Sequence, residues 1–271
     1  MTSFAPVVAV LRALDCLIAV NRLKEASVAD VARDTGLNRS TVVRMLETLI
    51  HAGFIVRQPM RAVYLPTGRT LDLSAGYQRH EEMALVAAPV LGALRQCLKW
   101  PSDVAVFDGD AMVVAQTSRG PGRLDFNRGP GYRAPLLGSS IGLSFLAFCS
   151  KADRARGLAA VKAGPEPWNA PARNTATLHR LLARLRRDGY ATMHPAYASA
   201  AYDGTASAVG VPILHGGVAV GSLNVMYLRD TIDEAAAIAR FVAPLREAAT
   251  EIAQALGDMR PSAESEGTID G

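Results

Sequence analysis

Residues 27–57 read SVADVARDTGLNRSTVVRMLETLIHAGFIVR, and this segment carries the clearest structural signals in the first part of the chain. Ser27 precedes a short segment of helical periodicity as its N-cap, and Asp30 stands three residues later in the place of the capping-box acid. Gly36 ends this helix, because glycine readily adopts the left-handed backbone of a sharp turn. Asn38 then caps a second helix. Two short helices joined by a tight glycine turn predict a helix-turn-helix.

The segments on either side extend this unit to a winged helix-turn-helix. Residues 54–58 (FIVRQ) and 62–66 (AVYLP) predict two short strands around a turn that contains Pro59. Upstream, residues 7–20 predict a helix. Its regularly spaced apolar residues share one face: Val7, Leu11, Leu14 and Ile18.

The second helix and the wing carry the predicted DNA contacts. If Val42 and Leu46 pack on the first helix, the polar side near the N-terminus of the second helix is exposed, where a recognition helix meets base edges in the major groove. Arginine pairs with guanine through two hydrogen bonds, and arginines on a wing can contact phosphates. The alternative is a three-helix packing unit whose arginines are merely solvated. The predicted DNA-binding residues are Arg39, Ser40, Thr41 and Arg44 on the helix, and Arg57 and Arg61 on the wing.

The charge distribution agrees with a nucleic-acid module at the N-terminal end. The 271-residue chain is long enough for two domains and has a formal net charge of +4. Residues 1–79 hold 10 Lys and Arg against 6 Asp and Glu, whereas the remainder holds 19 of each. The whole basic excess therefore lies in the segment with the helix-turn-helix.

Other features argue against the secreted, zinc-binding and membrane classes. Cys16, Cys97 and Cys149 are odd in number, far apart and without a CxxC pair, which argues against a disulfide framework or a cysteine zinc site. The N-terminus lacks the basic-then-apolar pattern of a signal peptide. The uncharged residues 206–228 are broken by Pro212 and a Gly-Gly pair, which predicts a buried β-hairpin. We expect a cytoplasmic, nucleoid-associated protein with no metal, no cofactor and no membrane partner.

The remainder of the chain predicts an α+β domain. Residues 67–100 have a helical pattern, with Pro89 acceptable at a helix start. Residues 102–117 alternate around Asp108-Gly109, a strong hairpin signal. Helices on one side of antiparallel hairpins imply an α+β architecture. The polar residues 258–271 predict a disordered tail.

A family resemblance runs through these segments. Besides the helix-turn-helix, it rests on YLPTGRTLDLSAG (64–76), APVLGALRQ (88–96), PLLGSSIGLSFLAF (135–148), LARLRRDGY (182–190), SAVGVPIL (207–214) and VGSLNVMYL (220–228). Over residues 4–256 the chain resembles the IclR family of bacterial transcription regulators. The segments WPSDVAVFDGDAMVV and RLDFNR look closest to the branch that regulates hydroxyphenylpropionate-type aromatic acid catabolism.

The resemblance implies an organisation as well as a function. It implies a winged helix-turn-helix domain over residues 1–69, a linker helix over 70–86 and a GAF-like effector-binding domain with an antiparallel sheet over 87–257. It also implies a homodimer or homotetramer on palindromic operator DNA, and RNA polymerase is a further expected partner. The function expected is control of a catabolic operon by a small organic acid.

An effector site is expected where a turn runs into an apolar helix. Residues 136–142 would place backbone N–H groups at that helix N-terminus, which favours a carboxylate. For the acidic residue that some relatives carry before the late strands, Tyr197, Tyr202 and Asp203 all qualify. Arginine suits a carboxylate, but for any single one of the loop arginines Arg123, Arg128 and Arg133 the sequence favours a solvated side chain over a ligand contact. The residues predicted for the effector, several of them by resemblance, are Leu137, Ser139, Ser140, Tyr202, Ser207, Asn224, Met226 and Arg123.

One motif allows a different function, that of a small-molecule esterase. Residues 138–142 read GSSIG and match the G-x-S-x-G nucleophile elbow, and Asp203 and His215 follow in the chain order of a hydrolase triad. The strand–helix alternation of a parallel sheet is missing, however, and no glycine-rich oxyanion motif precedes the serine. We therefore expect no catalytic residues and no enzyme.

Overall fold

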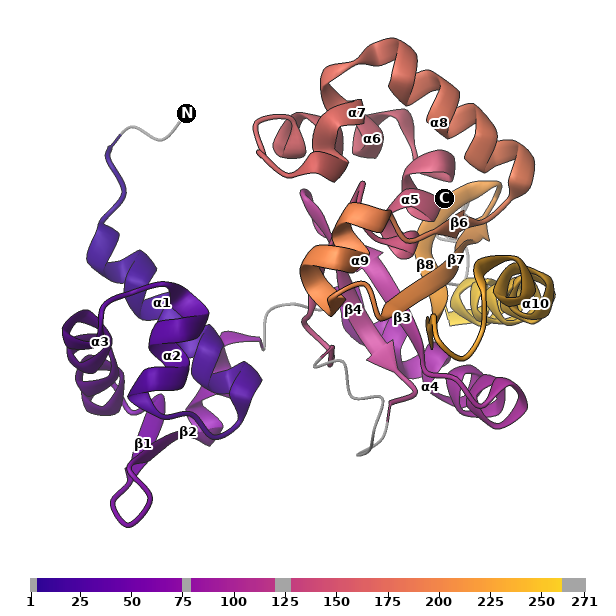
Figure 1. Cartoon of the computed structure of the whole chain (residues 1–271). Coiled ribbons are helices and arrows are strands. Elements are labelled where there is room, and N and C mark those ends of the chain that lie inside the picture. Colours follow the sequence, from indigo (N-terminus) through magenta and orange to yellow (C-terminus); the bar gives the residue numbers. More distant parts are fainter. Residues whose placement is uncertain (1–3, 75–78, 120–127, 260–271) are drawn as a thin grey trace, which may run out of the picture. The chain divides into compact units, whose positions relative to one another are not determined.

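A computed structural model describes residues 4–74, 79–119 and 128–259 of the chain (Figure 1). The chain divides into two compact units, Met1–Tyr77 and Gln78–Gly271, and each is described by itself. Residues 120–127, which include the predicted effector residue Arg123, lie outside the described parts, as do residues 260–271 of the predicted tail.

The N-terminal unit is the predicted helix-turn-helix followed by a two-stranded wing. Its core consists of buried apolar residues from all three helices and both strands, among them Leu17, Val31, Val42, Leu46 and Tyr64. Ala26 forms an isolated antiparallel bridge with Tyr64, which ties the wing to the segment before the second helix. The elements are α1 (Val8–Leu23), α2 (Val28–Thr35), α3 (Arg39–His51), β1 (Ile55–Gln58), β2 (Val63–Pro66) and the 3₁₀ helix η1 (Gly68–Leu73).

Helix α1 packs on a different face from the one with the most regular apolar spacing. Leu11 and Ile18 are 49% and 62% exposed, and Val7 and Leu14 are exposed as well. The core instead receives Cys16, Leu17, Ala19 and Val20, which are buried. A seven-residue apolar repeat is a seam that suits another helix, whereas a globular core takes a wider stripe.

The C-terminal unit is built on one antiparallel six-stranded sheet in the order β5-β4-β3-β8-β7-β6. Both predicted hairpins are present, since β3 pairs with β4 around Gly109 and β7 pairs with β8 around Gly216-Gly217. The strands are β3 (Ser102–Phe107), β4 (Ala111–Thr117), β5 (Arg133–Pro135), β6 (Ala191–Thr192), β7 (Ala206–His215) and β8 (Val218–Leu228).

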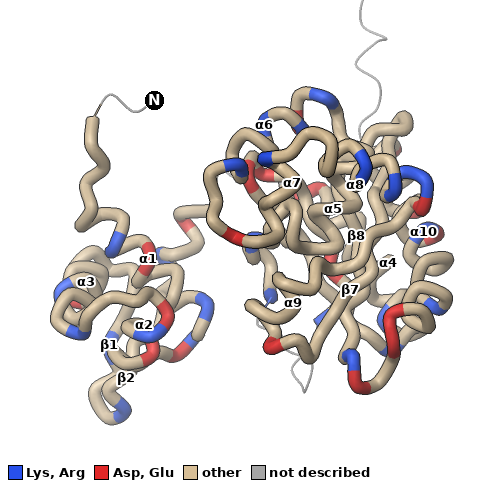
Figure 2. Tube along the Cα trace, turned by 45° about the horizontal axis from the view of Figure 1, so that its top comes forward, with Lys and Arg blue, Asp and Glu red and all other residues tan. Residues whose placement is uncertain are grey.

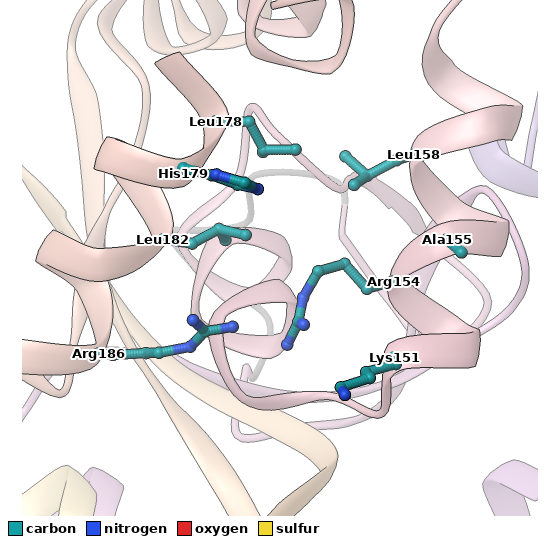
Figure 3. Close-up of a pocket in the computed structure, with 8 residues that line it drawn as sticks. All are labelled: Lys151, Arg154, Ala155, Leu158, Leu178, His179, Leu182 and Arg186. Atoms are coloured by element: carbon teal, nitrogen blue, oxygen red, sulfur yellow. The ribbon is translucent and has the colours of Figure 1, made fainter. Parts of the chain in front are cut away.

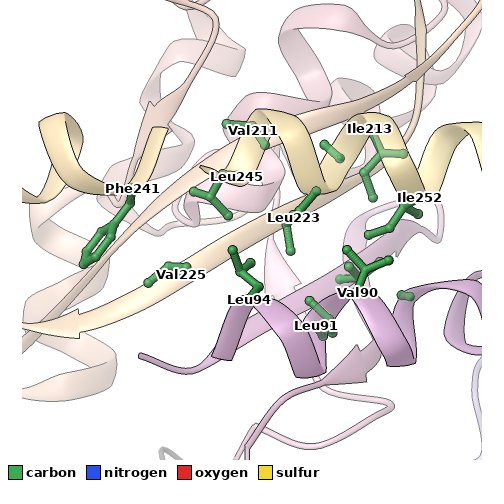
Figure 4. Packing of buried hydrophobic residues seen from close by; sticks show 14 of the residues in the cluster. Val90, Leu91, Leu94, Val211, Ile213, Leu223, Val225, Phe241, Leu245 and Ile252 are labelled. Atoms are coloured by element: carbon green, nitrogen blue, oxygen red, sulfur yellow. The ribbon is translucent and has the colours of Figure 1, made fainter. Parts of the chain in front are cut away.

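Helices cover both faces of this sheet, and the expectation of helices on one side is wrong. One face packs on α4 (Arg79–Leu98) and α10 (Glu234–Met259), with Leu94, Leu223 and Phe241 in the shared core (Figure 4). The other face packs on α5 (Ser140–Phe148) and α8 (Thr175–Asp188) through Phe107, Val114 and Leu182. Because both faces are buried, the strands are apolar on both sides, which explains the uncharged stretch 206–228. The remaining elements are α6 (Lys151–Val161), α7 (Ala170–Arg173) and α9 (Pro195–Tyr202), labelled in Figure 1, and the 3₁₀ helix η2 (Pro167–Asn169).

The segment between the two units differs from the sequence prediction. The predicted helix over 67–100 is divided into η1 and α4. The predicted linker helix over 70–86 therefore falls on the end of η1, on residues 75–78 outside the described parts, and on the start of α4. Pro89 lies inside α4 rather than at a helix start. Because proline has no N–H, the carbonyl four residues before it accepts no helical hydrogen bond from this position. Helix α10 includes residues 258 and 259, the first two of the predicted tail.

Candidate DNA-binding and effector sites

Local hydrogen bonds cap both helices of the helix-turn-helix, α2 and the recognition helix α3. The Oγ of Ser27 accepts the backbone N–H of Asp30 at 3.2 Å, and the Asp30 carboxylate accepts the Ser27 N–H at 3.0 Å. Gly36 has φ of 69°, the left-handed value that glycine adopts without strain. The Asn38 Oδ1 accepts the N–H of Thr41 at 2.9 Å. The capping box thus defines the start of α2, while Gly36 ends α2 and Asn38 begins α3.

The predicted DNA-contacting residues lie on the exposed side of α3 and on the wing. Arg39, Ser40 and Arg44 are exposed, and Thr41 is half-buried. Within the described residues, the side chains of Arg39, Arg44 and Arg57 have no hydrogen bond or ion pair, so their donors are available to a ligand. The Ser40 hydroxyl, in contrast, donates to the cap residue Asn38 at 2.8 Å. Figure 2 shows basic residues both on α3 and at the tip of β1–β2.

Arg61 at the wing tip already has a partner in the same domain. Its Nη2 lies 2.6 Å from Oε1 of Glu25, and both side chains are partly exposed. A surface ion pair of this kind contributes little, about 0–1 kcal/mol. Arg61 can therefore leave Glu25 for a phosphate at a small cost in free energy. Arg57 has no ion pair among the described residues that would have to be broken first.

In the C-terminal unit, the structure buries one loop arginine completely. Arg128 is 1% exposed, and its Nη1 lies 3.1 Å from the Sδ of Met226. Its guanidinium stacks over the Tyr132 ring at 4.5 Å. Within the described parts of the chain, Nε and Nη2 of Arg128 are buried and have no acceptor. A buried donor without a partner is costly, so this group can receive an acceptor that the described residues do not supply.

Aromatic side chains surround this guanidinium. The Tyr132 and Tyr197 hydroxyls are 2.8 Å apart, and the Tyr197 ring meets Trp168 edge-on at 5.3 Å and Tyr202 at 5.9 Å. Burial raises the pKa of Tyr197 and raises that of Tyr202 to about 12, although the nearby Arg128 cation opposes both shifts. The two phenols therefore keep their protons at neutral pH and can donate hydrogen bonds.

A second buried arginine defines the charge balance of this region. Arg119 binds Asp103 through two hydrogen bonds, Nε to Oδ1 at 3.1 Å and Nη2 to Oδ2 at 2.8 Å, and also contacts Met226. Asp103 is the one buried acidic residue of the described chain. Among the described residues, the two buried guanidiniums thus have a single buried carboxylate between them, and that carboxylate is bound to Arg119. The described groups of the site therefore carry one positive charge in excess.

Several predicted effector residues lie next to this group of side chains, and they are held together by hydrogen bonds. The group, called the Arg128 cluster from here on, consists of Arg128, Tyr132, Trp168, Tyr197, Tyr202 and Met226. The Asn224 Nδ2 donates to the Ser140 Oγ at 3.4 Å, and the Asn224 Oδ1 accepts the Asp103 N–H at 3.1 Å. Ser139 is the N-cap of α5, with its Oγ accepting the Gly142 N–H at 3.0 Å. Asn224 and Ser140 are therefore connected to the Asp103–Arg119 pair, while the Ser139 hydroxyl is used by the helix.

The other predicted positions divide into members of the cluster and residues elsewhere. Met226 and Tyr202 belong to it. Leu137 is buried in the apolar core beside α5, and Ser207 is buried on β7 opposite Tyr227. Arg133 is half-exposed and bound to Asp108 and Asp110, and Arg123 falls on undescribed residues. Sequence reasoning did not select Tyr132 and Trp168, because nothing in their spacing brings them next to β8.

The geometry does not assemble a hydrolase triad around the GSSIG motif. Asp203 precedes the start of β7, and His215 ends it, so a strand of ten residues separates them, about 30 Å at 3.3 Å per residue. Packing explains the glycine at position 142 instead, because a Cβ there would lie 2.6 Å from the Cα of Leu136. The motif reflects the close approach of α5 to the segment before it.

Two classes of site are missing from the described residues. No group of three or more His, Cys, Asp or Glu is placed to hold a metal ion there. None of the helices in that part of the chain is long and apolar enough to cross a membrane.

Comparison with known protein families agrees with both domains. Residues 9–59 match the IclR helix-turn-helix domain, and residues 75–254 match the C-terminal domain of the bacterial transcriptional regulator IclR. The chain belongs to the IclR family. It is therefore a transcriptional regulator with an N-terminal helix-turn-helix DNA-binding domain and a C-terminal effector domain.

Solved structures of IclR proteins share this fold over nearly the whole chain. The Thermotoga maritima IclR has 22% identity and a TM-score of 0.63, with 93% of this chain and 100% of its own chain covered. An IclR family regulator from Brucella abortus has 22% identity and a TM-score of 0.60, with 93% of each chain covered. An IclR homolog from Microbacterium hydrocarbonoxydans, complexed with 4-hydroxybenzoate, has 23% identity and a TM-score of 0.61, covering 92% and 99%.

Proposed function

We propose that this IclR-family protein binds palindromic operator DNA as a homodimer or homotetramer and responds to a small aromatic monocarboxylic acid. The acid binds at the Arg128 cluster, and the regulated genes form a catabolic operon, as in the branch that controls aromatic acid degradation. The buried guanidinium of Arg128 carries the proposal. Its Nε and Nη2 have no acceptor in the described chain, and one carboxylate offers two acceptors in matching geometry.

The surroundings of Arg128 favour an aromatic ring on the acid. Trp168, Tyr197 and Tyr202 supply ring faces and edges for stacking. The Tyr132–Tyr197 hydroxyl pair offers a donor and an acceptor to a ring substituent. The complex of the Microbacterium homolog with 4-hydroxybenzoate supports this class of ligand.

The effector part of the proposal is tested by a thermal-shift screen of organic acids, with benzoate and 4-hydroxybenzoate included. A ligand that binds only the folded state raises the melting temperature by mass action. We expect the aromatic monocarboxylates to raise it more than the matching amides, because only the acids complement the excess charge. Equal shifts with benzoate and benzamide would contradict the assignment.

The DNA part assigns base reading to α3 and phosphate contact to the wing. Arg44→Ala should weaken specific binding to the protein's own upstream DNA by about 1–3 kcal/mol while leaving the fold intact. Arg57→Ala should weaken binding to all sequences and reduce the salt slope by about one. The matched control is Arg33→Ala, an exposed residue of α2 bound to Asp30. Unchanged operator affinity for Arg44→Ala in a gel-shift assay would refute the recognition role.

The exposed seam of α1 supports the dimeric form. Val7, Leu11, Leu14 and Ile18 follow a four-three-four spacing, and all are exposed in the single chain, which fits pairing with α1 of a second copy. Leu14→Glu should shift the sedimentation of the full chain toward smaller species and lower operator affinity. Arg12→Glu, off the seam on the same helix, is the control. Identical sedimentation of parent and Leu14→Glu would exclude α1 as the interface.

A further inference from the structure

A hollow separate from the Arg128 cluster lies between α6 and α8 (Figure 3). It has a volume of 510 Å³, and four basic side chains, Lys151, Arg154, His179 and Arg186, lie along it. Its apolar part is formed by Leu158, Leu178 and Leu182. The residues that line it include no Asp or Glu. Basic groups that converge without an acidic partner repel one another unless an anion joins them.

The two arginines of this hollow are fixed in position by backbone carbonyls. The Arg154 Nε donates to the Leu146 carbonyl at 2.9 Å, and its Nη2 donates to the Cys149 carbonyl at 2.9 Å. The Arg186 Nε donates to the Ala147 carbonyl at 2.7 Å. These carbonyls belong to the C-terminal end of α5, where cations are favoured by the helix dipole. Both guanidiniums are therefore oriented before any ligand arrives.

The hydrogen bonds to the carbonyls at the end of α5 use only some of the N–H donors of each guanidinium. Within the described chain, Nη1 of Arg154 and both terminal nitrogens of Arg186 make no hydrogen bond. Figure 3 shows the two guanidiniums pointing toward one another, with the Lys151 ammonium directed into the same hollow. The three cations lie at one end, and the leucines lie at the other.

We propose that this hollow is a second ligand site, for an organic anion with an apolar body. The anionic head binds Arg154, Arg186 and Lys151, and the apolar body lies on the leucines of α6 and α8. The chemistry that fits is an amphiphilic monocarboxylate. The site does not depend on the Arg128 cluster, because it uses different elements and different residues.

The experiment is calorimetric titration of the full chain carrying Arg128→Met with octanoate, so that the first site does not contribute. We expect one site, with octanoate binding more tightly than acetate, octanol or inorganic phosphate, because head and body both contribute. Ala155→Glu places a carboxylate on α6 at a position that lines the hollow. That carboxylate should compete for the cations and weaken octanoate binding by about tenfold or more.

The matched control is Ala160→Glu, an exposed position of α6 that does not line the hollow, with the same change of charge. Arg186→Gln should weaken binding as Ala155→Glu does, whereas Arg184→Gln on the same helix should not. Equal affinities of the parent and Ala155→Glu, of octanoate and octanol, or of octanoate and phosphate would overturn the proposal, as would no binding of octanoate at all. Unchanged melting temperatures of the two Glu variants verify that the fold is retained.

Discussion

Arg128→Met should stabilise the ligand-free protein and at the same time abolish tight binding of the effector. Methionine has a flexible apolar side chain that can fill much of the space of the buried arginine. It removes the two guanidinium nitrogens that have no acceptor in the described chain. It leaves the Asp103–Arg119 pair intact, since Arg119 binds both oxygens of Asp103. No buried carboxylate is therefore left without its partner.

The magnitudes follow from the groups that are removed. Each unpaired buried donor costs about 1–3 kcal/mol, and the stacking on Tyr132 that is lost is worth about 0.5–2 kcal/mol. The net gain is about 2 kcal/mol, or about 4–8 °C in melting temperature for a domain of this size. In the complex, two charge-assisted hydrogen bonds of about 1.5–3 kcal/mol each are lost. The affinity for a carboxylate should fall about 100-fold or more.

Two measurements test this reasoning, thermal unfolding without ligand and calorimetric titration with 4-hydroxybenzoate. Arg133→Met is the matched control, because Arg133 belongs to the same segment but is half-exposed and bound to Asp108 and Asp110. It should change both quantities little. A lower melting temperature for ligand-free Arg128→Met would refute the argument from unpaired donors, whatever the identity of the effector. Unchanged affinity would remove Arg128 from the binding site.

Two further predictions concern the elements that hold the proposed effector site. The Nδ1 of His194 accepts the Ala196 N–H at 3.2 Å at the start of α9, and burial lowers its pKa from 6.5. Its contribution to stability is therefore complete above pH 6.5 and lost as the pH falls toward the lower folded-state pKa. His194→Asn, a cap that does not titrate, should flatten the melting temperature against pH, and parallel profiles would contradict this. Gly142→Ala should cost about 1–3 kcal/mol in unfolding free energy, because its Cβ would meet the Leu136 backbone, whereas Gly92→Ala has open space and should be neutral or stabilising.

The sequence predicts the N-terminal domain well because local chemistry determines it. The capping box joins Ser27 and Asp30, which are only three positions apart. The end of α2 depends on the left-handed backbone of one residue, Gly36. The hairpin turns at Gly109 and Gly216 are local in the same sense. Such features depend on residue type and spacing alone.

Features that depend on long-range packing are not predicted in the same way. The choice of the buried face of α1 depends on α2, α3 and β2, and the most regular apolar face is left exposed. Arg123, Arg128 and Arg133 are equivalent in spacing, and only the fold separates Arg128, which is buried, from Arg133, which pairs with surface acids. Tyr132, Trp168 and Tyr197 come from three separate segments.

Charge balance among the described residues gives a reason for a buried arginine that is predicted to lower the stability of the ligand-free protein. Asp103 could neutralise either guanidinium, but both of its oxygens are bound by Arg119. Met226 contacts both arginines through an uncharged sulfur and cannot supply the missing charge. An Arg128 that served packing alone would be replaced by an apolar residue with a gain in stability. In the proposed complex, a single negative charge on the ligand would balance the cation that the described residues leave without a carboxylate, and a monoanion fits this balance better than a dianion.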